Sequence, residues 1–253
     1  MSTYMLSIAA HLWNAGYRVI RINLRDHGES HHLNEGLFHS CRLAEAIGAV
    51  RWVQTAFPDE ALMLGGYSLG GNFSLRIAAA ANESTLRIER VVAICPVLDP
   101  AQTMQALDLG FSAYRIYFIR RWRRSLQRKK RAFPILYDFS NLERFNTLHE
   151  MTDYFVTNYT EFPDLRTYLQ GYALTGERLT DLDVPSKILL AEDDPVVPIR
   201  GLDEISTPKS LSIEISRFGG HCGFVSNLGS PSWLDDYFLN AFDVTRGNHS
   251  QAV

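Results

Sequence analysis

The sequence predicts an α/β fold in which a mostly parallel sheet is flanked by helices. Apolar stretches typical of buried strands alternate with helical stretches along the chain, an order that indicates crossover connections between parallel strands. The length of 253 residues lies near the upper end for one hydrophobic core, and 46% hydrophobic residues suffice to build it. We expect one domain over residues 1–253, with a core at about 1–98 and 183–243 and an inserted helical cap at about 99–182.

Hydrophobic periodicity places the individual elements. A helix is expected at Ser40–Ala56, where apolar side chains recur at three- and four-residue intervals, and an alanine-rich helix at Phe73–Ala81. Between residues 99 and 182 the pattern is mainly helical and rich in aromatic side chains. Short apolar runs bounded by turn residues predict strands at Ala61–Gly65, Arg90–Cys95, Lys187–Ala191 and Leu211–Ile215.

The most informative motif is Gly66-Tyr67-Ser68-Leu69-Gly70, which lies between an expected strand and an expected helix. A serine on so sharp a turn needs neighbours without side chains that would clash across the bend, which explains the glycines two residues before and after it. Such a turn exposes the Ser68 hydroxyl at a helix N-terminus. There the backbone N–H of Leu69 and the positive end of the helix can stabilise an oxyanion, so the motif predicts acyl transfer.

A serine nucleophile requires two further groups. Its hydroxyl is weakly nucleophilic near neutral pH, so it needs a histidine base, and that histidine needs a carboxylate to fix its tautomer. Asp193 and Asp194 follow the expected strand Lys187–Ala191, at the edge where open parallel sheets keep their sites. His221 follows the strand Leu211–Ile215. The order serine, acid, histidine is the one that α/β-hydrolases use among serine hydrolases.

Four stretches occur in a fixed order along the chain: Asn23–Ser30, Gly66–Asn72, Asp193–Pro198 and Gly219–Phe224. Together they closely resemble the α/β-hydrolase superfamily and, within it, the YheT-like branch of esterases. The resemblance extends from the first residues to about Phe242. Four motifs in the right order are far more specific than any one of them.

The resemblance implies roles for three side chains. Ser68 is the implied nucleophile, His221 the general base and Asp194 the acid that orients it. Asp194 is preferred over Asp193 because the superfamily usually places its acid in an Asp-x-x-Val-Pro frame, which Asp194–Pro198 fits. The choice between the two carboxylates stays open.

The resemblance also implies segments that this sequence lacks. In the superfamily several strands and a His-Gly-type loop, whose amide forms the second half of the oxyanion hole, precede the helix that Met1–Met5 resembles. Tyr17–Leu24 resembles the fourth strand of the family and Ala61–Gly65 the fifth, with the third strand normally between them. We therefore expect an N-terminally truncated fold with unpaired backbone groups at this gap. Met1 is then not the true start, or the sheet closes differently, or the chain is the product of a decaying gene.

Composition limits the classes of function and location. A formal net charge of −3 gives no indication of nucleic-acid binding. The three cysteines are few and widely spaced, without a Cys-x-x-Cys motif, which is typical of a reducing compartment. The N-terminus has no secretion signal and the chain has no run of about 18 apolar residues, so a cytoplasmic location is expected.

The histidines His27, His31 and His32 are close in sequence and are the obvious candidates for a metal site. No cysteine or carboxylate joins them at a ligand spacing, so we assign neither a metal nor any other cofactor.

One segment of the expected cap is strongly basic, with nine Lys and Arg residues and no acid between Arg115 and Arg131. One interpretation is a solvated helix face that pairs with acids elsewhere. The other is a peripheral membrane contact through residues 115–131, in which arginines bind anionic headgroups and apolar side chains contact lipid. The side chains that would contact lipid are Ile116, Phe118, Ile119, Trp122 and Leu126.

The predicted function is hydrolysis of a small-molecule carboxylic ester, with an apolar acyl part beneath the cap, through an acyl-enzyme at Ser68. The same set of residues serves thioesterases, amidases and acyltransferases. The alternative is a truncated, catalytically weak or inactive homologue with a binding role or none. The missing oxyanion loop favours this alternative, whereas the serine, acid and histidine favour the enzyme.

Overall fold

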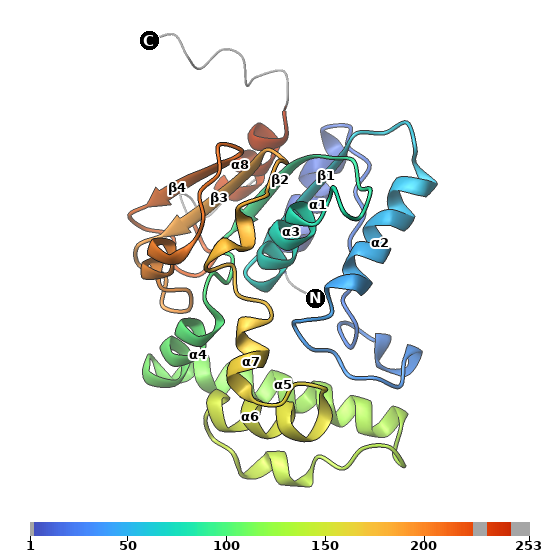
Figure 1. The fold of residues 1–253 in the computed structure, drawn as a ribbon, viewed down its shortest axis with the longest axis vertical. Coiled ribbons are helices and arrows are strands. Elements are labelled where there is room, and N and C mark those ends of the chain that lie inside the picture. The colour runs from blue at the N-terminus through green and yellow to red at the C-terminus, as the bar shows by residue number, and fades with distance from the viewer. Residues whose placement is uncertain (1–2, 225–231, 244–253) are drawn as a thin grey trace.

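Four parallel strands form the centre of the protein in the computed structural model, which describes residues 3–224 and 232–243. Within these ranges the strands are Leu62–Tyr67 (β1), Ile88–Ile94 (β2), Ser186–Ala191 (β3) and Leu211–Ser216 (β4). They lie in the order β1-β2-β3-β4, and every neighbouring pair is parallel (Figure 1). The predicted α/β fold class, a parallel sheet with flanking helices, is therefore confirmed.

Helices precede, separate and follow the strands along the chain, and four of them lie in succession between β2 and β3. The α-helices are Thr3–Asn14 (α1), Leu43–Ala56 (α2), Leu69–Ala79 (α3), Pro100–Leu109 (α4), Ser112–Ala132 (α5), Leu148–Tyr159 (α6), Leu165–Gln170 (α7) and Trp233–Phe242 (α8). Short 3-10 helices occur at Ser30–Leu33, Ser140–Arg144, Glu177–Leu179 and Ile199–Glu204. No described helix combines the length and the apolar character that crossing a membrane requires.

Helices cover both faces of the sheet, and the side chains of its two central strands divide between them. Successive residues on a strand point to opposite faces. The set that packs with α2 and α3 comprises Val91, Ala93, Ile188 and Leu190. The set that packs with α1 and α8 comprises Val92, Ile94, Leu189 and Ala191. Burial on both faces explains why these strands are almost continuously apolar in sequence.

The elements expected from periodicity are confirmed within a few residues of their predicted limits. All four predicted strands are present. The helix predicted at Ser40–Ala56 begins only at Leu43, and residues 40–42 form the turn that precedes it. The helix predicted from Phe73 begins at Leu69, directly after Ser68, so its first turn contains Gly70 and Gly71. The polar C-terminal residues from Thr245 onward lie outside the described residues.

The segment Tyr17–Leu24, whose sequence resembles a strand of the family, does not form a strand. Extended backbone becomes a strand only when a neighbouring strand exchanges hydrogen bonds with it. In the described part of the chain β1 pairs with β2 alone and lies at the edge of the sheet. A groove with a volume of about 190 Å³ is lined by both residues 17–22 and β1.

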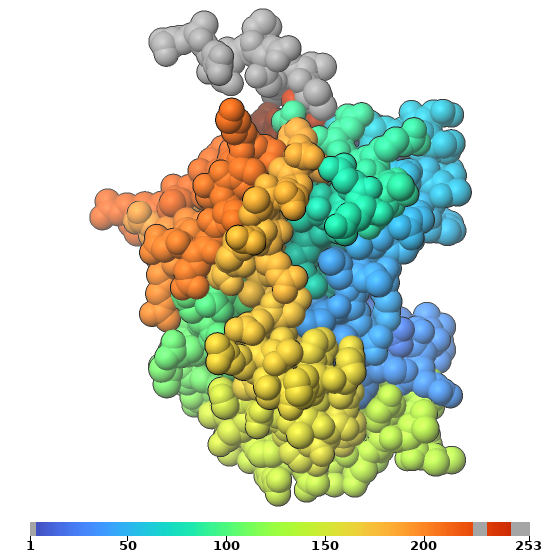
Figure 2. Space-filling model, viewed as in Figure 1, coloured from blue at the N-terminus to red at the C-terminus, as the bar shows by residue number. Residues whose placement is uncertain are grey.

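The helices α4–α7 gather at one end of the molecule, shown at the bottom of Figures 1 and 2. The loop between α1 and α2 lies against them, and two contacts fix it there. Lys129 Nζ of α5 donates to Asp26 Oδ1 at 2.8 Å, and the backbone N–H of Ser40 donates to Tyr168 Oη of α7 at 3.1 Å. The division of the chain into a core and a cap at 99–182 stays a prediction.

The basic helix α5 directs part of its apolar face into the protein. Ile119 and Leu126 are each 5% exposed within the hydrophobic core, and Phe118 and Trp122 pack partly against it. Ile116 is exposed. Most of the side chains considered for lipid contact therefore touch protein, and membrane contact through 115–131 stays a prediction.

Lys129 is the unexpected member of the basic run, because it is fully buried. Its ammonium pairs with Asp26 and also donates to the carbonyls of His31, Asn34 and Gly36. A buried charge is tolerated when it is paired and hydrogen-bonded. Lys129 therefore fastens the loop after α1 to α5.

Candidate active site

Ser68 lies at the turn between β1 and α3. β1 ends at Tyr67 and α3 begins at Leu69, so Ser68 is the single residue between them. Its φ is +51°, in the left-handed region that non-glycine residues avoid and that costs about 1–3 kcal/mol. The N–H of Ser68 donates to the carbonyl of Ile94 at 2.8 Å, which continues the pairing of β1 with β2 into the turn. The Ser68 side chain is half-buried.

The two glycines of the motif contribute differently to this turn. A Cβ on Gly66 would lie 2.3 Å from the carbonyl carbon and oxygen of Gly70, so a side chain at Gly66 cannot be accommodated. A Cβ on Gly70 would meet nothing within 4 Å. The prediction that both glycines avoid a side-chain clash is therefore right for Gly66 and wrong for Gly70. The backbone of Gly70 is what Gly66 approaches, so only one of the two positions needs to lack a Cβ.

His221 connects the serine with an acid. Its Nε2 lies 3.0 Å from Ser68 Oγ, and its Nδ1 lies 2.9 Å from Asp194 Oδ2. The carboxylate of Asp194 is fully buried, whereas 14% of the His221 side chain is exposed. Ser68 follows β1, Asp194 follows β3 and His221 follows β4, so the carboxyl ends of three strands bring together three residues that are far apart in sequence.

The two neighbouring acids, between which the sequence leaves a choice, have separate contacts. Asp194 faces His221, and its Oδ1 also accepts from the backbone N–H groups of Val196 and Val197 at 2.8 and 3.0 Å. Asp193 Oδ1 instead accepts from the backbone N–H groups of Gly219 and Gly220, both at 2.8 Å. Asp193 thus holds the loop that carries His221, while Asp194 contacts the imidazole itself.

The surroundings of His221 shift its pKa in opposing directions. Burial lowers the pKa, because it disfavours the imidazolium. The hydrogen bond with Asp194 and the neighbouring Cys222 outweigh burial, so the pKa of His221 is raised above its ordinary value. This environment stabilises the imidazolium that forms when His221 accepts a proton.

Leu69 is the first residue of α3, and its backbone N–H precedes the hydrogen-bonded ladder of the helix. The first N–H groups of a helix and its positive dipole end attract anions. The site therefore combines a hydroxyl, an imidazole with a carboxylate, and a backbone donor directed out of a helix N-terminus.

Two buried polar residues of α3 support the site and are not identified from the sequence. Asn72 Nδ2 donates to the carbonyls of Val97 and Tyr172, both at 2.8 Å. Arg76 donates to the carbonyl of Ser40 at 2.9 Å. These bonds tie three loops to the helix that follows Ser68. The spacing of two polar residues four apart on an otherwise apolar helix is the signal that identifies them.

The other candidate histidines do not converge. His31 Nε2 lies 2.8 Å from Ser125 Oγ, and His27 and His32 hydrogen-bond backbone carbonyls within their own loop.

Within the described residues, the group of three metal-ligand side chains that does form is Cys95, His221 and Cys222, beside Ser68.

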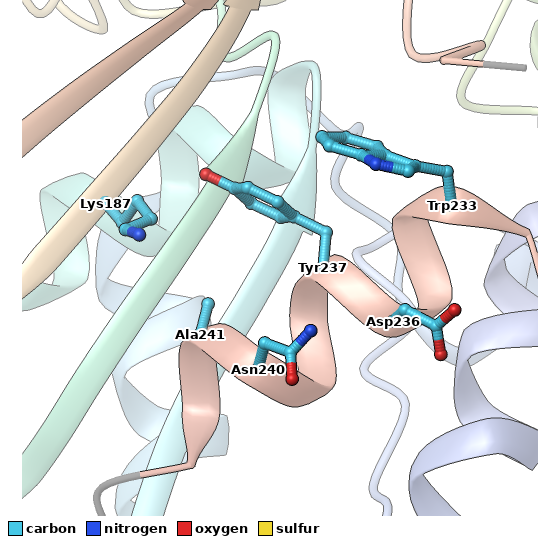
Figure 3. A pocket seen from close by; sticks show the side chains of 6 residues that line it. All are labelled: Lys187, Trp233, Asp236, Tyr237, Asn240 and Ala241. Carbon is cyan, nitrogen blue, oxygen red and sulfur yellow. The ribbon is translucent and has the colours of Figure 1, made fainter. Parts of the chain in front are cut away.

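Two surface cavities lie away from the three side chains around Ser68. One is the groove along β1, which none of the three lines. The other is lined by α8 and Lys187 of β3, where the Tyr237 ring lies between Lys187 and Trp233 (Figure 3). Tyr237 stacks on Trp233 with ring centroids 5.1 Å apart, and its hydroxyl donates to Glu214 Oε2 at 2.9 Å. These contacts account for the Tyr237 side chain as part of the packing of α8 on the sheet.

Comparisons with known proteins agree with this architecture. Over 205 residues the chain is 24% identical to the Escherichia coli (strain K12) protein named "Putative esterase YheT", which covers 79% of this chain and 60% of that protein. The chain thus spans about 60% of the length of this curated relative. It is also similar in fold to a crystal structure of a mutant of the meta-cleavage product hydrolase CumD. The TM-score is 0.51 and the identity 17%, over 88% of this chain and 79% of that chain.

A family model described as the alpha/beta hydrolase fold matches residues 2–227, which is most of the chain. This match includes the turn at Ser68 and the loops that carry Asp194 and His221. The protein belongs to the α/β-hydrolase fold family.

Proposed function

We propose that the protein is a serine hydrolase that cleaves carboxylic esters through a Ser68–His221–Asp194 triad. The observation that carries this proposal is the continuous series of contacts from Asp194 Oδ2 to His221 Nδ1, at 2.9 Å, and from His221 Nε2 to Ser68 Oγ, at 3.0 Å. The strained turn at Ser68 supports it, because a nucleophile elbow holds its serine in this way.

In the first half of the reaction His221 Nε2 accepts the Ser68 proton as Ser68 Oγ attacks the ester carbonyl. Asp194 keeps the other ring proton on Nδ1 and stabilises the imidazolium. The N–H of Leu69 and the positive end of α3 stabilise the tetrahedral oxyanion. His221 then gives its proton to the departing alcohol, and an acyl-enzyme remains on Ser68.

In the second half water replaces the alcohol. His221 removes a proton from the water, which attacks the acyl carbonyl, and the second tetrahedral intermediate collapses to a carboxylic acid. The proton returns from His221 to Ser68 Oγ. The balance of the cycle is one ester and one water converted to one acid and one alcohol, with no step through a cofactor.

The name of the Escherichia coli relative supports an ester as the substrate class. The proposed substrate is a small molecule whose acyl part is apolar. Lys129 of α5 holds the loop after α1 against the α4–α7 helices through Asp26, and we propose that the acyl part binds between these helices and the sheet.

The test is labelling with a fluorophosphonate probe, which reacts only with an activated serine. Ser68→Ala is compared with Ser74→Ala, because Ser74 lies on the same helix and its hydroxyl donates to the carbonyl of Gly70 at 3.0 Å. We expect labelling of the parent and of Ser74→Ala, and none of Ser68→Ala or His221→Ala. Hydrolysis of a chromogenic ester by Ser68→Ala is expected to fall by about 10⁴-fold or more.

Equal labelling of the parent and of Ser68→Ala would contradict the proposal. An unlabelled parent with native circular dichroism would favour the alternative of an inactive homologue with a binding role.

A further inference from the structure

Two thiols that the proposed reaction does not use lie beside the triad. Cys95 follows the last residue of β2, and Cys222 follows His221 in the loop after β4. One ligand atom from each of Cys95, His221 and Cys222 lies within 4.8 Å of the other two. The sequence gives no sign of this cluster, because the two cysteines come from different strand ends and only the sheet brings them together.

The spacing of these atoms suits a small tetrahedral metal ion. Zn²⁺ binds cysteine sulfur at about 2.3 Å and histidine nitrogen at about 2.0 Å, which places neighbouring donors about 3.5–3.8 Å apart. The ligand atoms are at most 4.8 Å apart, so their separations need to shorten by only about 1 Å to reach these values. Two thiolates and one imidazole form a known zinc ligand set that leaves a fourth position open.

The contacts of the two thiols with backbone carbonyls are weak. Cys95 Sγ donates to the carbonyl of Gly220 and Cys222 Sγ to the carbonyl of Ile94, each over 3.8 Å. A thiol is a weak donor. Exchanging these bonds for bonds between metal and thiolate therefore gives up little.

The backbone holds both cysteines in uncommon conformations. φ is +42° at Cys95 and +62° at Cys222, and the residues are 0% and 6% exposed. Non-glycine residues keep such conformations only where the surrounding structure imposes them. The thiols are therefore positioned by the fold rather than by flexible surface segments.

Both ring nitrogens of His221 already have partners, Nδ1 with Asp194 and Nε2 with Ser68. A metal on Nε2 takes the nitrogen that faces Ser68 and keeps the contact with Asp194 as the outer carboxylate bond that metal-bound histidines usually make. A metal on Nδ1 displaces Asp194. Either geometry removes one of the two contacts on which the triad depends.

We propose that Cys95, Cys222 and His221 form a binding site for a thiophilic divalent cation of the Zn²⁺ type, whose occupancy switches the triad off. Binding releases one proton from each thiol and forms two metal–sulfur bonds and one metal–nitrogen bond, without any oxidation or reduction. The binding stands on the cluster alone, whereas the loss of activity rests on the proposed function.

The binding is tested on the reduced full chain by titration with Co²⁺, followed by displacement with Zn²⁺. Co²⁺ bound to thiolate gives a charge-transfer absorption. We expect one such ion per chain in the parent. In Cys95→Ser and Cys222→Ser we expect the affinity for Co²⁺ to fall by at least about 10-fold. Substituting even a residue that only hydrogen-bonds a metal ligand costs that much. Cys41→Ser is the matched control, because Cys41 lies outside the cluster and its thiol bonds the carbonyl of Tyr168.

X-ray absorption at the zinc edge of the parent tests the ligands without any substitution, in case a serine variant does not fold. We expect two sulfur ligands at about 2.3 Å and at least one nitrogen at about 2.0 Å. Absence of thiolate absorption in the folded parent, or its full retention in Cys95→Ser and Cys222→Ser, would overturn the site.

Fluorophosphonate labelling of Ser68 then tests the switch. We expect Zn²⁺ to suppress labelling of the parent and of Cys41→Ser, and a chelator to restore it. Labelling unchanged in a chain that holds zinc on two sulfurs would overturn the switch. A parent that is unlabelled even without metal would instead refute the proposed function, and the cobalt titration would still decide the site.

Discussion

Among the residues that the structure describes, β2 has a strand neighbour on both sides and β1 has one only, and the two strands differ accordingly. Val91, Val92, Ala93 and Ile94 of β2 are all 0% exposed. In β1 the residues Leu62–Leu64 are half-buried, Gly65 is exposed, and the groove runs along them. Ile20 and Ile22 in the same groove are 41% and 42% exposed.

The last two residues of β1 are nevertheless buried, and they are the ones that lead into Ser68. Tyr67 contacts the rings of Tyr4 and Phe238, with centroids 4.8 and 5.4 Å away. Asp194 and His221 come from the ends of β3 and β4. Ser68, Asp194 and His221 thus meet at the packed end of the sheet, whereas the groove is lined mainly by the first residues of β1 and reaches Tyr67 at its end. Substitutions on the two sides should therefore have unequal effects.

The largest expected effect on the packed side is that of Asp194→Asn. An amide presents a donor to Nδ1 and selects the wrong tautomer of His221, so we expect kcat for a chromogenic ester to fall by about 10⁴-fold. Asp193→Asn keeps an oxygen that can accept from Gly219 and Gly220, and should cost no more than about 10-fold, the scale of one hydrogen bond. Steady-state kinetics of both variants measure this. A larger loss for Asp193→Asn would reverse the assignment of the acid.

Gly66→Ala tests whether the Ser68 end of β1 is as tightly packed as the strands inside the sheet. Because its Cβ would meet the backbone of Gly70 at 2.3 Å, we expect the free energy of unfolding to fall by about 3 kcal/mol or more. Gly70→Ala meets nothing and replaces a helical glycine, so a change within about 1 kcal/mol is expected. Urea denaturation compares the two. Equal stability of both variants would show that this turn is not closely packed.

Shortening a leucine inside the sheet and another at its edge measures directly how much packing each strand contributes to stability. Leu190→Ala, in β3 with Leu190 1% exposed, should lower the free energy of unfolding by about 2–5 kcal/mol. Leu64→Ala, at the groove, should lower it by about 1 kcal/mol because the side chain is only half-buried. Thermal and urea unfolding give both values. A loss at Leu64 as large as that at Leu190 would mean that the groove is closed in solution.

The smallest expected effect is a shift in the pH dependence of activity, and it arises from the groups that contact His221. His221 must be neutral to accept the Ser68 proton, and Asp194 and Cys222 raise its pKa despite burial. Activity is therefore present above this pKa and lost as the pH falls through it. We expect kcat/KM for the ester to reach half its maximum above pH 6.5, the ordinary value for histidine. A midpoint below 6.5 would show that burial dominates.

Sequence and structure agree best where the chemistry is local. The turn at Ser68 follows from the motif, since only one strand, one bend and one helix are involved. The serine, acid and histidine follow three different strands in the predicted order along the chain, and their side chains are in contact. The preference for Asp194 over Asp193 came only from the Asp-x-x-Val-Pro frame of the family, because both carboxylates follow the same strand and only the position of the His221 loop distinguishes their contacts.

Other features depend on partners far away in the chain. Lys129 reads as one of nine basic residues, and its burial follows from Asp26 and three carbonyls of a distant loop. Tyr17–Leu24 has the composition of a strand but has no strand to pair with in the described part of the chain. Cys95 and Cys222 meet only because β2, β3 and β4 are neighbours.

The sequence by itself determined the α/β class and the limits of the strands to within a few residues, and it predicted Ser68, His221 and one of two neighbouring aspartates as the site. Periodicity and turn chemistry act over a few residues and are therefore visible in one chain. The tertiary structure alone settled whether Asp193 or Asp194 faces His221, and it decided which lysine is buried and which cysteines are adjacent. Each of these depends on which distant backbone or side chain supplies a hydrogen bond or fills a volume, and such pairings are set only when the whole chain packs.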